Sequence, residues 1–170
     1  LIVNNNQVYG LTKGQASPTS MEGFVTKAQP QGVHSMAFNP VAVAVAMKAG
    51  FVARSFSGMP DHLSNMIQAG ISHKGFAIID VLQPCVSFNK VNTYKWYKDR
   101  CREIPADHKP ENWESAIKLA FQWDDGIPVG VIYHNDRPPF ESHFPASTKG
   151  PLVKQAVDTA ELNGILQTYA

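Results

Sequence analysis

Apolar residues along the chain alternate between continuous runs and helical spacing. Residues 76–82 are a nearly continuous apolar run broken by Asp80, which is typical of a buried strand in a parallel sheet, and residues 51–56 also predict a strand. Between them, from Asp61 onward, apolar side chains recur three and four residues apart, which predicts an amphipathic helix that stops at Gly75. These residues therefore predict a strand–helix–strand unit.

The same alternation continues on both sides of this unit. Residues 1–3 look like the end of a buried strand, and the helix predicted over residues 39–50 begins with an asparagine cap and a proline. Residues 113–121 predict a third helix, residues 128–133 a last strand, and the chain is weakly helical from Pro151. Right-handed crossovers between such elements predict an α/β fold with a mainly parallel sheet flanked by helices.

Two long segments fall outside this alternation. Residues 4–38 form a loop of a length that is uncommon unless the loop is functional or disordered. Residues 86–112 are rich in aromatic and basic side chains, with Trp96 and Tyr97 lying between lysines and arginines. Such a cluster could stack on nucleic acid, but we favour a contact between subunits or a partner-docking loop, because the rest of the chain is not basic.

The composition narrows the class of protein. The chain has 170 residues, of which 44% are hydrophobic and 17% charged, enough for one domain with a sizeable core. Lys plus Arg number 15 and Asp plus Glu 14, which argues against a nucleic-acid partner. The longest uncharged apolar stretch, residues 40–47, is too short to span a bilayer, and no signal peptide is predicted. We expect a cytoplasmic protein that binds neither nucleic acid nor membrane.

The start of the chain lacks a methionine and lies inside a predicted strand. We interpret the chain as a piece of a longer polypeptide whose amino-terminal part is missing, although proteolytic maturation would leave the same start.

The long loop opens with residues that suit a metal ion. Asn4, Asn5 and Asn6 follow the carboxyl end of the first predicted strand, which is where open α/β sheets bind ligands. Asparagine side chains and main-chain carbonyls offer the oxygen ligands that Mg²⁺ prefers. Asparagine and glycine also form ordinary turns, so the residues alone leave both interpretations open.

Two longer runs resemble a known family. Residues 9–19 (YGLTKGQASPT) and residues 79–89 (IDVLQPCVSFN) are similar to the signature of the β subunit of 2-oxoacid:ferredoxin oxidoreductases. The resemblance covers most of the chain, and further matches lie at residues 51–54, 61–63, 73–76, 92–94 and, more loosely, 128–133 and 137–138.

This resemblance implies a thiamine diphosphate-binding fold and a Mg²⁺ ion. Relatives hold the cofactor through a motif that begins Gly-Asp-Gly and ends in an asparagine pair, which Asn5 and Asn6 match. Asn6 would give its side-chain oxygen to Mg²⁺ and Val8 its main-chain carbonyl, while Tyr9 and Gly10 would line the cofactor. The Gly-Asp-Gly half is absent from the sequence.

The resemblance also implies a substrate loop. Leu11, Thr12 and Lys13 would line the site of the 2-oxoacid, and Lys13 would face the substrate carboxylate, for which a compact cation is suited. The resemblance therefore makes these three the candidate catalytic residues.

Cys85 is the second anchor of the resemblance. Relatives bind a [4Fe–4S] cluster on this subunit, and the cysteine that follows Gln-Pro corresponds to Cys85. Such a cluster needs four thiolates, and the chain has two cysteines, so the remaining ligands would lie outside this chain. We interpret Cys101 as a small buried hydrophobic residue and expect no disulfide in a reducing cytoplasm. Asn6 and Cys85 would border one crevice.

The implied function is oxidative decarboxylation by a hetero-oligomeric enzyme. The 2-oxoacid would be pyruvate, 2-oxoglutarate or a broad set, the products acyl-CoA and CO₂, and the electrons would pass through the cluster to ferredoxin. Residues 1–90 would be the second half of the cofactor domain, and residues 91–170 an extension packed on it and on the α subunit. We expect no activity from this chain alone. The alternatives are a non-catalytic, partner-binding remnant and, more weakly, a cluster-free thiamine decarboxylase.

Overall fold

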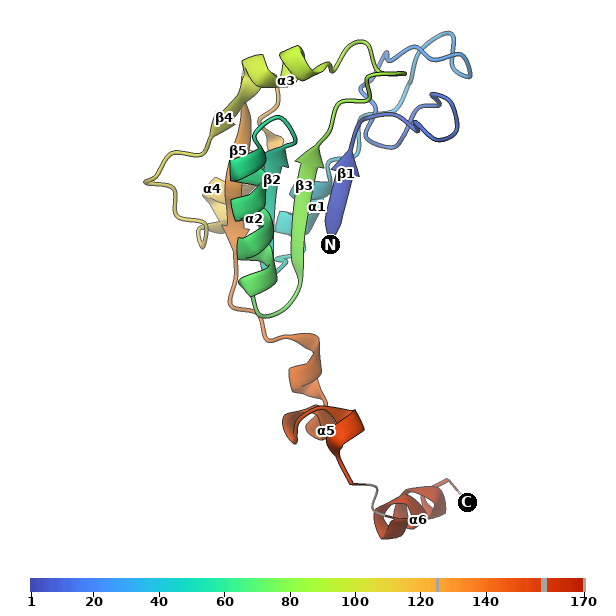
Figure 1. Cartoon of the computed structure of the whole chain (residues 1–170), viewed down its shortest axis with the longest axis vertical. Coiled ribbons are helices and arrows are strands. Elements are labelled where there is room, and N and C mark those ends of the chain that lie inside the picture. Colours follow the sequence, from blue (N-terminus) through green and yellow to red (C-terminus); the bar gives the residue numbers. More distant parts are fainter. Residues whose placement is uncertain (125, 157–158, 170) are drawn as a thin grey trace. The chain divides into compact units, whose positions relative to one another are not determined.

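Five strands form one sheet in the computed structural model, which describes residues 1–124, 126–156 and 159–169 (Figure 1). Across the sheet the order of the strands is β1–β3–β2–β5–β4. Their bounds are β1 Ile2–Asn5, β2 Phe51–Phe56, β3 Ala77–Leu82, β4 Cys101–Glu103 and β5 Ile127–His134. The predicted α/β fold is therefore confirmed, with β2 buried along its whole length.

The direction of the last strand departs from the prediction. β1, β3 and β2 are parallel, as are β4 and β5, but β5 runs antiparallel to β2. The helix before β5, residues 113–121, ends near the carboxyl ends of the parallel strands. Its position there is shown by Asn39, which caps the start of the first helix and donates from its side chain to the carbonyl of Ala120 (2.8 Å). β5 therefore enters the sheet from that end and runs back.

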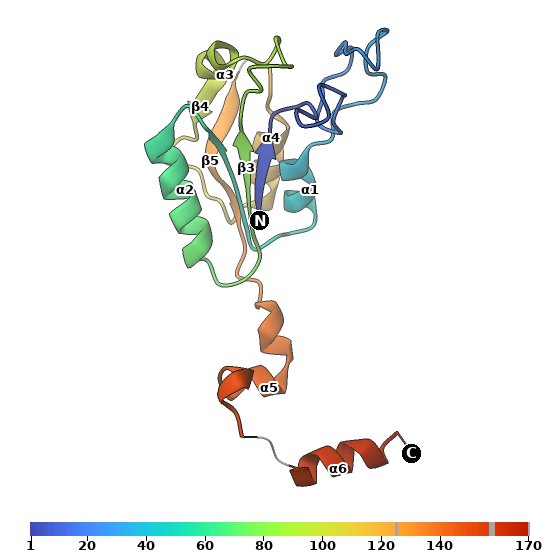
Figure 2. The same ribbon diagram turned by 45° about the vertical axis from the view of Figure 1, so that its right-hand side comes forward.

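Helices cover both faces of the sheet (Figure 2). α2 (Pro60–Ser72) packs through Leu63, Met66 and Ile67 on one face. α1 (Pro40–Ala46) and α4 (Trp113–Phe121) pack together on the other face, and four of their buried residues contact the core of β2 and β5 there: Val41, Val45, Ala116 and Ala120. This apolar burial on two faces is the main force that holds the sheet.

The element bounds differ from the predicted ones in small ways. α1 ends at Ala46, before the predicted Gly50, because Lys48 adopts a left-handed conformation (φ 53°) that stops the helix. α2 ends at Ser72, and the next residue, His73, is already extended. β4 was not predicted, and α3 (Tyr94–Arg100) falls within the segment expected to hold a short helix.

The chain divides into two compact units, residues 1–137 and residues 138–170. The described residues of the second unit form four short helical segments: Phe140–His143, α5 Pro145–Thr148, Leu152–Lys154 and α6 Thr159–Gln167. Of the helix predicted from Pro151, residues 157 and 158 lie outside the described residues. The boundary predicted after residue 90 stays a prediction. No helix in the described part of the chain is long and apolar enough to cross a membrane.

Candidate functional site

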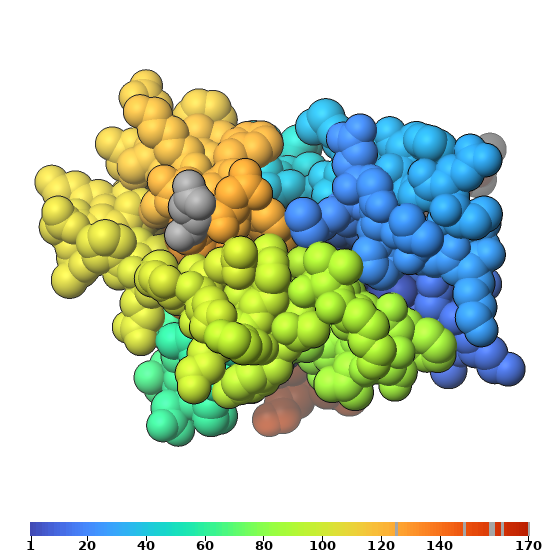
Figure 3. All heavy atoms as spheres, turned by 90° about the horizontal axis from the view of Figure 1, so that it is seen from above, coloured from blue at the N-terminus to red at the C-terminus, as the bar shows by residue number. Residues whose placement is uncertain are grey.

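The carboxyl end of the parallel strands is covered by two loops that lie side by side, residues 6–38 and residues 83–93 (Figure 3). Three hydrogen bonds join β1 and the loop of residues 6–38 to the loop of residues 83–93 that follows β3. Gln83 N donates to Asn5 O (2.9 Å), Asn89 Nδ2 to Asn6 O (3.3 Å), and Asn92 Nδ2 to the sulfur of Met21 (3.4 Å). Each predicted anchor, Asn6 and Cys85, therefore lies on a loop at the same end of the sheet.

Asn6 and Val8 form a tight turn just after β1. The side-chain oxygen of Asn6 accepts a hydrogen bond from Val8 N (3.2 Å), and Gln7 between them adopts a left-handed conformation (φ 56°). Amide and main-chain oxygens are hard ligands, and the Asn6 oxygen keeps a second lone pair, so these two residues fit an oxygen-liganded Mg²⁺. Among the described residues, no group of three or more His, Cys, Asp or Glu is placed to hold a metal ion.

Residues 9–15 form a closed loop whose tip carries the predicted substrate residues. Tyr9 N donates to Gln15 O (2.8 Å), and Gly14 N donates back to Tyr9 O (2.9 Å). Leu11, Thr12 and Lys13 are exposed at the tip, where Lys13 has a left-handed conformation (φ 69°). The structure thus brings the three residues together on one exposed tip.

Cys85 lies against this loop. A Cβ atom added to Gly10 would lie 3.6 Å from the Cys85 sulfur, and one added to Gly14 would lie 2.9 Å from the ring of Phe88. The Cys85 thiol is free and half-buried, so the site fits a single thiolate ligand at this place. Cys101 lies on β4, and burial raises the pKa of its thiol to about 11, which disfavours the thiolate that a cluster needs.

A buried polar chain crosses the sheet beneath these loops. Arg54 Nε donates to Asp80 Oδ2 (3.2 Å), Asn5 Nδ2 donates to Asp80 Oδ1 (3.1 Å), and Thr19 Oγ1 donates to Asn5 Oδ1 (2.8 Å). Arg54 and Asp80 are each 1% exposed. Of these four residues, only Asn5 belonged to a site predicted from the sequence. The sequence did contain a signal for the ion pair: one positive charge, Arg54, and one negative charge, Asp80, each inside a predicted strand.

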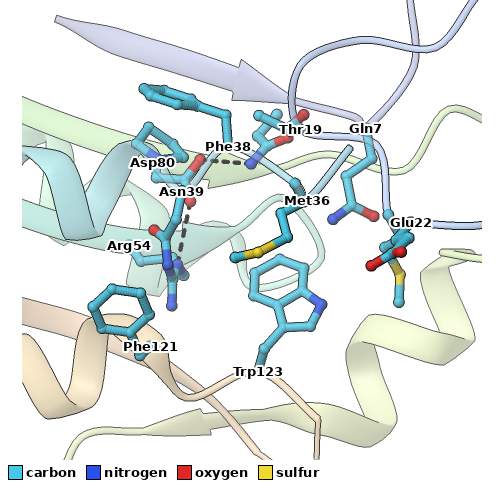
Figure 4. Close-up of a pocket in the computed structure, with 14 residues that line it drawn as sticks. Gln7, Thr19, Glu22, Met36, Phe38, Asn39, Arg54, Asp80, Phe121 and Trp123 are labelled. Carbon is cyan, nitrogen blue, oxygen red and sulfur yellow. Dashed lines mark hydrogen bonds and ion pairs between the residues drawn. The ribbon is translucent and has the colours of Figure 1, made fainter. Parts of the chain in front are cut away.

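A cavity of about 260 Å³ opens beside this polar chain (Figure 4). Asn5, Gln7, Arg54 and Asp80 contribute polar groups, while most of its wall is carbon and sulfur from Met21, Met36, Phe38, Pro40, Phe121 and Trp123. Asn6, Val8 and Cys85 are not among its lining residues.

A serine–histidine contact lies on the opposite face of the sheet. Ser55 Oγ is 2.8 Å from His62 Nδ1, and burial lowers the pKa of His62, an effect that Glu103 opposes. Because Ser55 is completely buried, its hydroxyl is closed to substrates, and we assign this pair to the packing of α2 on β2.

Comparisons with known proteins match both halves of the chain. The family model of the thiamine pyrophosphate enzyme C-terminal TPP binding domain matches residues 1–81, and that of the C-terminal part of the pyruvate ferredoxin oxidoreductase β subunit matches residues 85–149. The β subunit of 2-oxoacid:ferredoxin oxidoreductase 1 from Aeropyrum pernix is 44% identical over 146 residues. The chain belongs to the β-subunit family of 2-oxoacid:ferredoxin oxidoreductases.

Other members of this β-subunit family are also similar over most of the chain. The 2-oxoacid:ferredoxin oxidoreductase β subunit from Sulfolobus sp is 40% identical over 160 residues. These matches cover 79% of the chain for the Aeropyrum protein and 87% for the Sulfolobus protein. They cover 46% and 52% of those two relatives, so the chain spans about half the length of each.

A solved structure from the family has the same fold. The 2-oxoglutarate:ferredoxin oxidoreductase from Magnetococcus marinus, with 2-oxoglutarate, coenzyme A and succinyl-CoA bound, matches with a TM-score of 0.85 and 29% identity. The match covers 96% of this chain and 56% of that chain. The thiamine pyrophosphate-domain fold of residues 1–81 thus follows from the family.

Proposed function

We propose that the chain is the cofactor-bearing part of a β subunit that, with an α subunit, oxidises a 2-oxoacid such as pyruvate or 2-oxoglutarate and passes the electrons to ferredoxin. Coenzyme A would accept the acyl group. The observation that carries the proposal is the hydrogen bonding of Asn89, which ties the loop of Asn6 to the loop of Cys85. Two matched signature segments are thereby held at one end of the sheet, where α/β folds bind ligands.

In this proposal the turn after β1 holds the cofactor's metal ion. Asn6 would give its side-chain oxygen and Val8 its main-chain oxygen to Mg²⁺, which would bind the diphosphate of thiamine diphosphate. When bound, this cofactor supplies the carbanion that attacks the 2-oxo carbon. Val8 is only 2% exposed, and its N–H donates to the Asn6 side-chain oxygen (3.2 Å), so the turn is formed in the absence of a ligand.

The loop tip would bind the substrate. Lys13 offers an exposed ammonium group, and no ion pair to it is found among the described residues, so its charge is free for a carboxylate. Leu11, 99% exposed, offers an apolar surface beside it. The tip would therefore hold a 2-oxoacid by its carboxylate and its side chain.

Cys85 would be one thiolate of a [4Fe–4S] cluster whose other three ligands lie outside this chain. Such a cluster accepts single electrons, as oxidation by ferredoxin requires. The Cβ position of Gly10 lies 3.6 Å from the Cys85 sulfur, so the loop and the thiol are within van der Waals contact distance. This proximity supports a cluster beside the cofactor loop.

The experiment compares the two cysteines. The full-length β subunit is produced anaerobically with its α subunit, and the iron content, the visible spectrum and ferredoxin reduction by pyruvate and by 2-oxoglutarate are measured. We expect Cys85→Ser to lose the cluster absorbance and the activity, and Cys101→Ser, the matched control, to keep both. A wild-type complex without iron, or a Cys85→Ser complex with an unchanged spectrum, would contradict the proposal and favour a non-catalytic remnant.

A further inference from the structure

The segment between β3 and β4 concentrates positive charge after Cys85. Residues 83–103 carry five lysines and arginines and two carboxylates, a net charge of +3, whereas the whole chain carries +1, so the rest of the chain carries −2. Figure 3 shows this segment, in lime green, as one continuous strip across the top of the molecule. We call its four cations that lack an ion pair the basic face: Lys90, Lys98, Arg100 and Arg102.

The cations of the basic face are held in place without being neutralised. Three of them donate to main-chain carbonyls: Arg102 to Asp99 (2.6 Å), Arg100 to Trp96 (3.4 Å) and Lys90 to Val86 (2.5 Å). The carboxylate of Asp99, the one acid on α3, pairs with Lys95 (2.7 Å). Across the part of the chain that the structure describes, no carboxylate pairs with a cation of the basic face. These charges are therefore free to attract a negatively charged partner.

Lys90 brings one of these charges close to Cys85. Its ammonium group donates to the carbonyl of Val86, the residue after Cys85, and Asn89 N donates to Cys85 O (3.0 Å). Residues 85–90 thus form a turn that carries both the thiol and a fixed cation. A protein docked on the basic face would therefore lie beside the thiol.

Exposed apolar side chains lie along the same segment. Val86 is 79% exposed, Val91 54% and Tyr94 50%. Apolar side chains among charged ones are typical of the surfaces by which proteins bind one another. Short-lived complexes of redox proteins use small interfaces, so a strip of this length is sufficient for one.

The aromatic side chains of α3 are not available to stack on nucleic-acid bases. Tyr97 is completely buried, and the half-buried ring of Trp96 has the Arg100 guanidinium 4.4 Å from its centre. Tyr94 packs its ring against Phe56, with the ring centres 5.2 Å apart. Binding of single strands uses free aromatic faces, so this segment fits an acidic protein better than a nucleic acid.

We propose that the basic face is the docking surface for an acidic electron-transfer protein, the ferredoxin of the proposed function. Opposite charges would speed the encounter and orient the acceptor toward Cys85. This inference rests on the proposed function, because a cluster at Cys85 is what gives a docked protein an electron to accept. Loss of docking would raise the KM for ferredoxin and leave the chemistry of the 2-oxoacid intact.

The experiment compares two double charge reversals in the anaerobic complex of the full-length β subunit with its α subunit. Lys98→Glu with Arg102→Glu changes two exposed residues of the basic face. Lys74→Glu with Lys118→Glu, the matched control, makes the same change of charge at exposed residues outside it. The probe is an acidic bacterial ferredoxin, whose Kd is measured by calorimetry and whose KM by its reduction at low salt. Methyl viologen, a small dication that gains nothing from a basic surface, is the second electron acceptor.

We expect the reversal on the basic face to raise the Kd and the KM for ferredoxin at least about tenfold, and the control to change them less than about twofold. The iron content and the visible spectrum should be unchanged in both double variants, and the rate with methyl viologen should not fall. High salt should weaken the binding of ferredoxin to the wild-type complex more than to the basic-face variant, because it screens exposed charges.

Equal affinities of the two double variants for ferredoxin, in a complex that contains iron and reduces methyl viologen, would overturn this inference and leave the proposed function intact. Failure of the basic-face variant to assemble with the α subunit would assign the surface to that interface and would also overturn it. The same holds if a single-stranded oligonucleotide binds more tightly than ferredoxin. A wild-type complex without iron would overturn both proposals.

Discussion

Arg54 and Asp80 place opposite charges inside two neighbouring buried strands. Burial raises the pKa of the Asp80 carboxyl, while the Arg54 guanidinium and the Asn5 amide oppose that rise. Burying two ions costs much of what their attraction returns, so the pair is poor evidence of added stability. The fold nevertheless needs both residues of the pair, since either charge alone would be buried without a compensating partner.

Removal of one charge from this pair should therefore be costly. We expect Asp80→Asn, which keeps the shape of the side chain, to lower the free energy of unfolding by about 3–5 kcal/mol, because Arg54 stays charged and buried. Urea unfolding followed by circular dichroism measures the change. In the control, Asp99→Asn removes an exposed partner of Lys95 and should leave the unfolding midpoint nearly unchanged. Similar losses in both variants would contradict this account.

For single residues, the sequence indicated which side chains are unusual for their place better than it indicated their contacts. Asp80 was visible as the one charge in an apolar run, but nothing local indicates that its partner is Arg54, because the register of β2 on β3 brings them together. The burial of Gln7, whose Oε1 has no hydrogen-bond partner among the described residues, could not be predicted either, since burial of a loop side chain depends on segments distant in the sequence. The roles assigned to Asn6, Lys13 and Cys85 stay predictions.

The closed loop of residues 9–15 depends on two glycines that differ in their tolerance of a side chain. Gly14 has φ +100° and lies against the ring of Phe88, whereas a Cβ on Gly10 would make an ordinary contact with Cys85. The closing turn of this loop is therefore restricted to glycine at position 14.

Alanine at these two positions should have unequal effects. We expect Gly14→Ala to lower the free energy of unfolding by about 2 kcal/mol, because of backbone strain and the clash with Phe88, and Gly10→Ala to change it by less than about 0.5 kcal/mol. Urea unfolding of both variants measures the difference. Equal losses, or a larger loss for Gly10→Ala, would show that the loop is not closed as described.

The predicted elements were correct where local sequence carries the signal. The apolar run of residues 76–82 predicted β3, residues 51–56 predicted β2, and the Asn39-Pro40 cap predicted the start of α1. β4 was missed because Cys101–Glu103 has neither an apolar run nor an alternation. The direction of β5 could not be predicted, because hydrophobic periodicity is the same for parallel and antiparallel strands.

Among the residues that the structure describes, the buried hydrophobic core lies in the first unit, since none of its members lies beyond Tyr133. We expect a chain that ends at Arg137 to keep a cooperative urea transition with a midpoint close to that of the full chain. Circular dichroism and urea unfolding of the two chains provide the measurement.

A second truncation tests the boundary predicted after residue 90. A chain that ends at Lys90 lacks β5, which pairs with β2, and α4, which packs on α1. We expect it to lose the cooperative transition. A folded 1–90 fragment would instead support the boundary predicted from the sequence.

The reversed direction of β5 has a consequence for how relatives diverge. Because the strand starts at the end of the sheet where the parallel strands finish, the connection that precedes it delivers Trp123 to the guanidinium of Arg54. Insertions or replacements in that connection would reshape the wall of the cavity without disturbing a single ladder of the sheet. Proteins that share this sheet can therefore differ in the shape of this cavity through changes in one short segment.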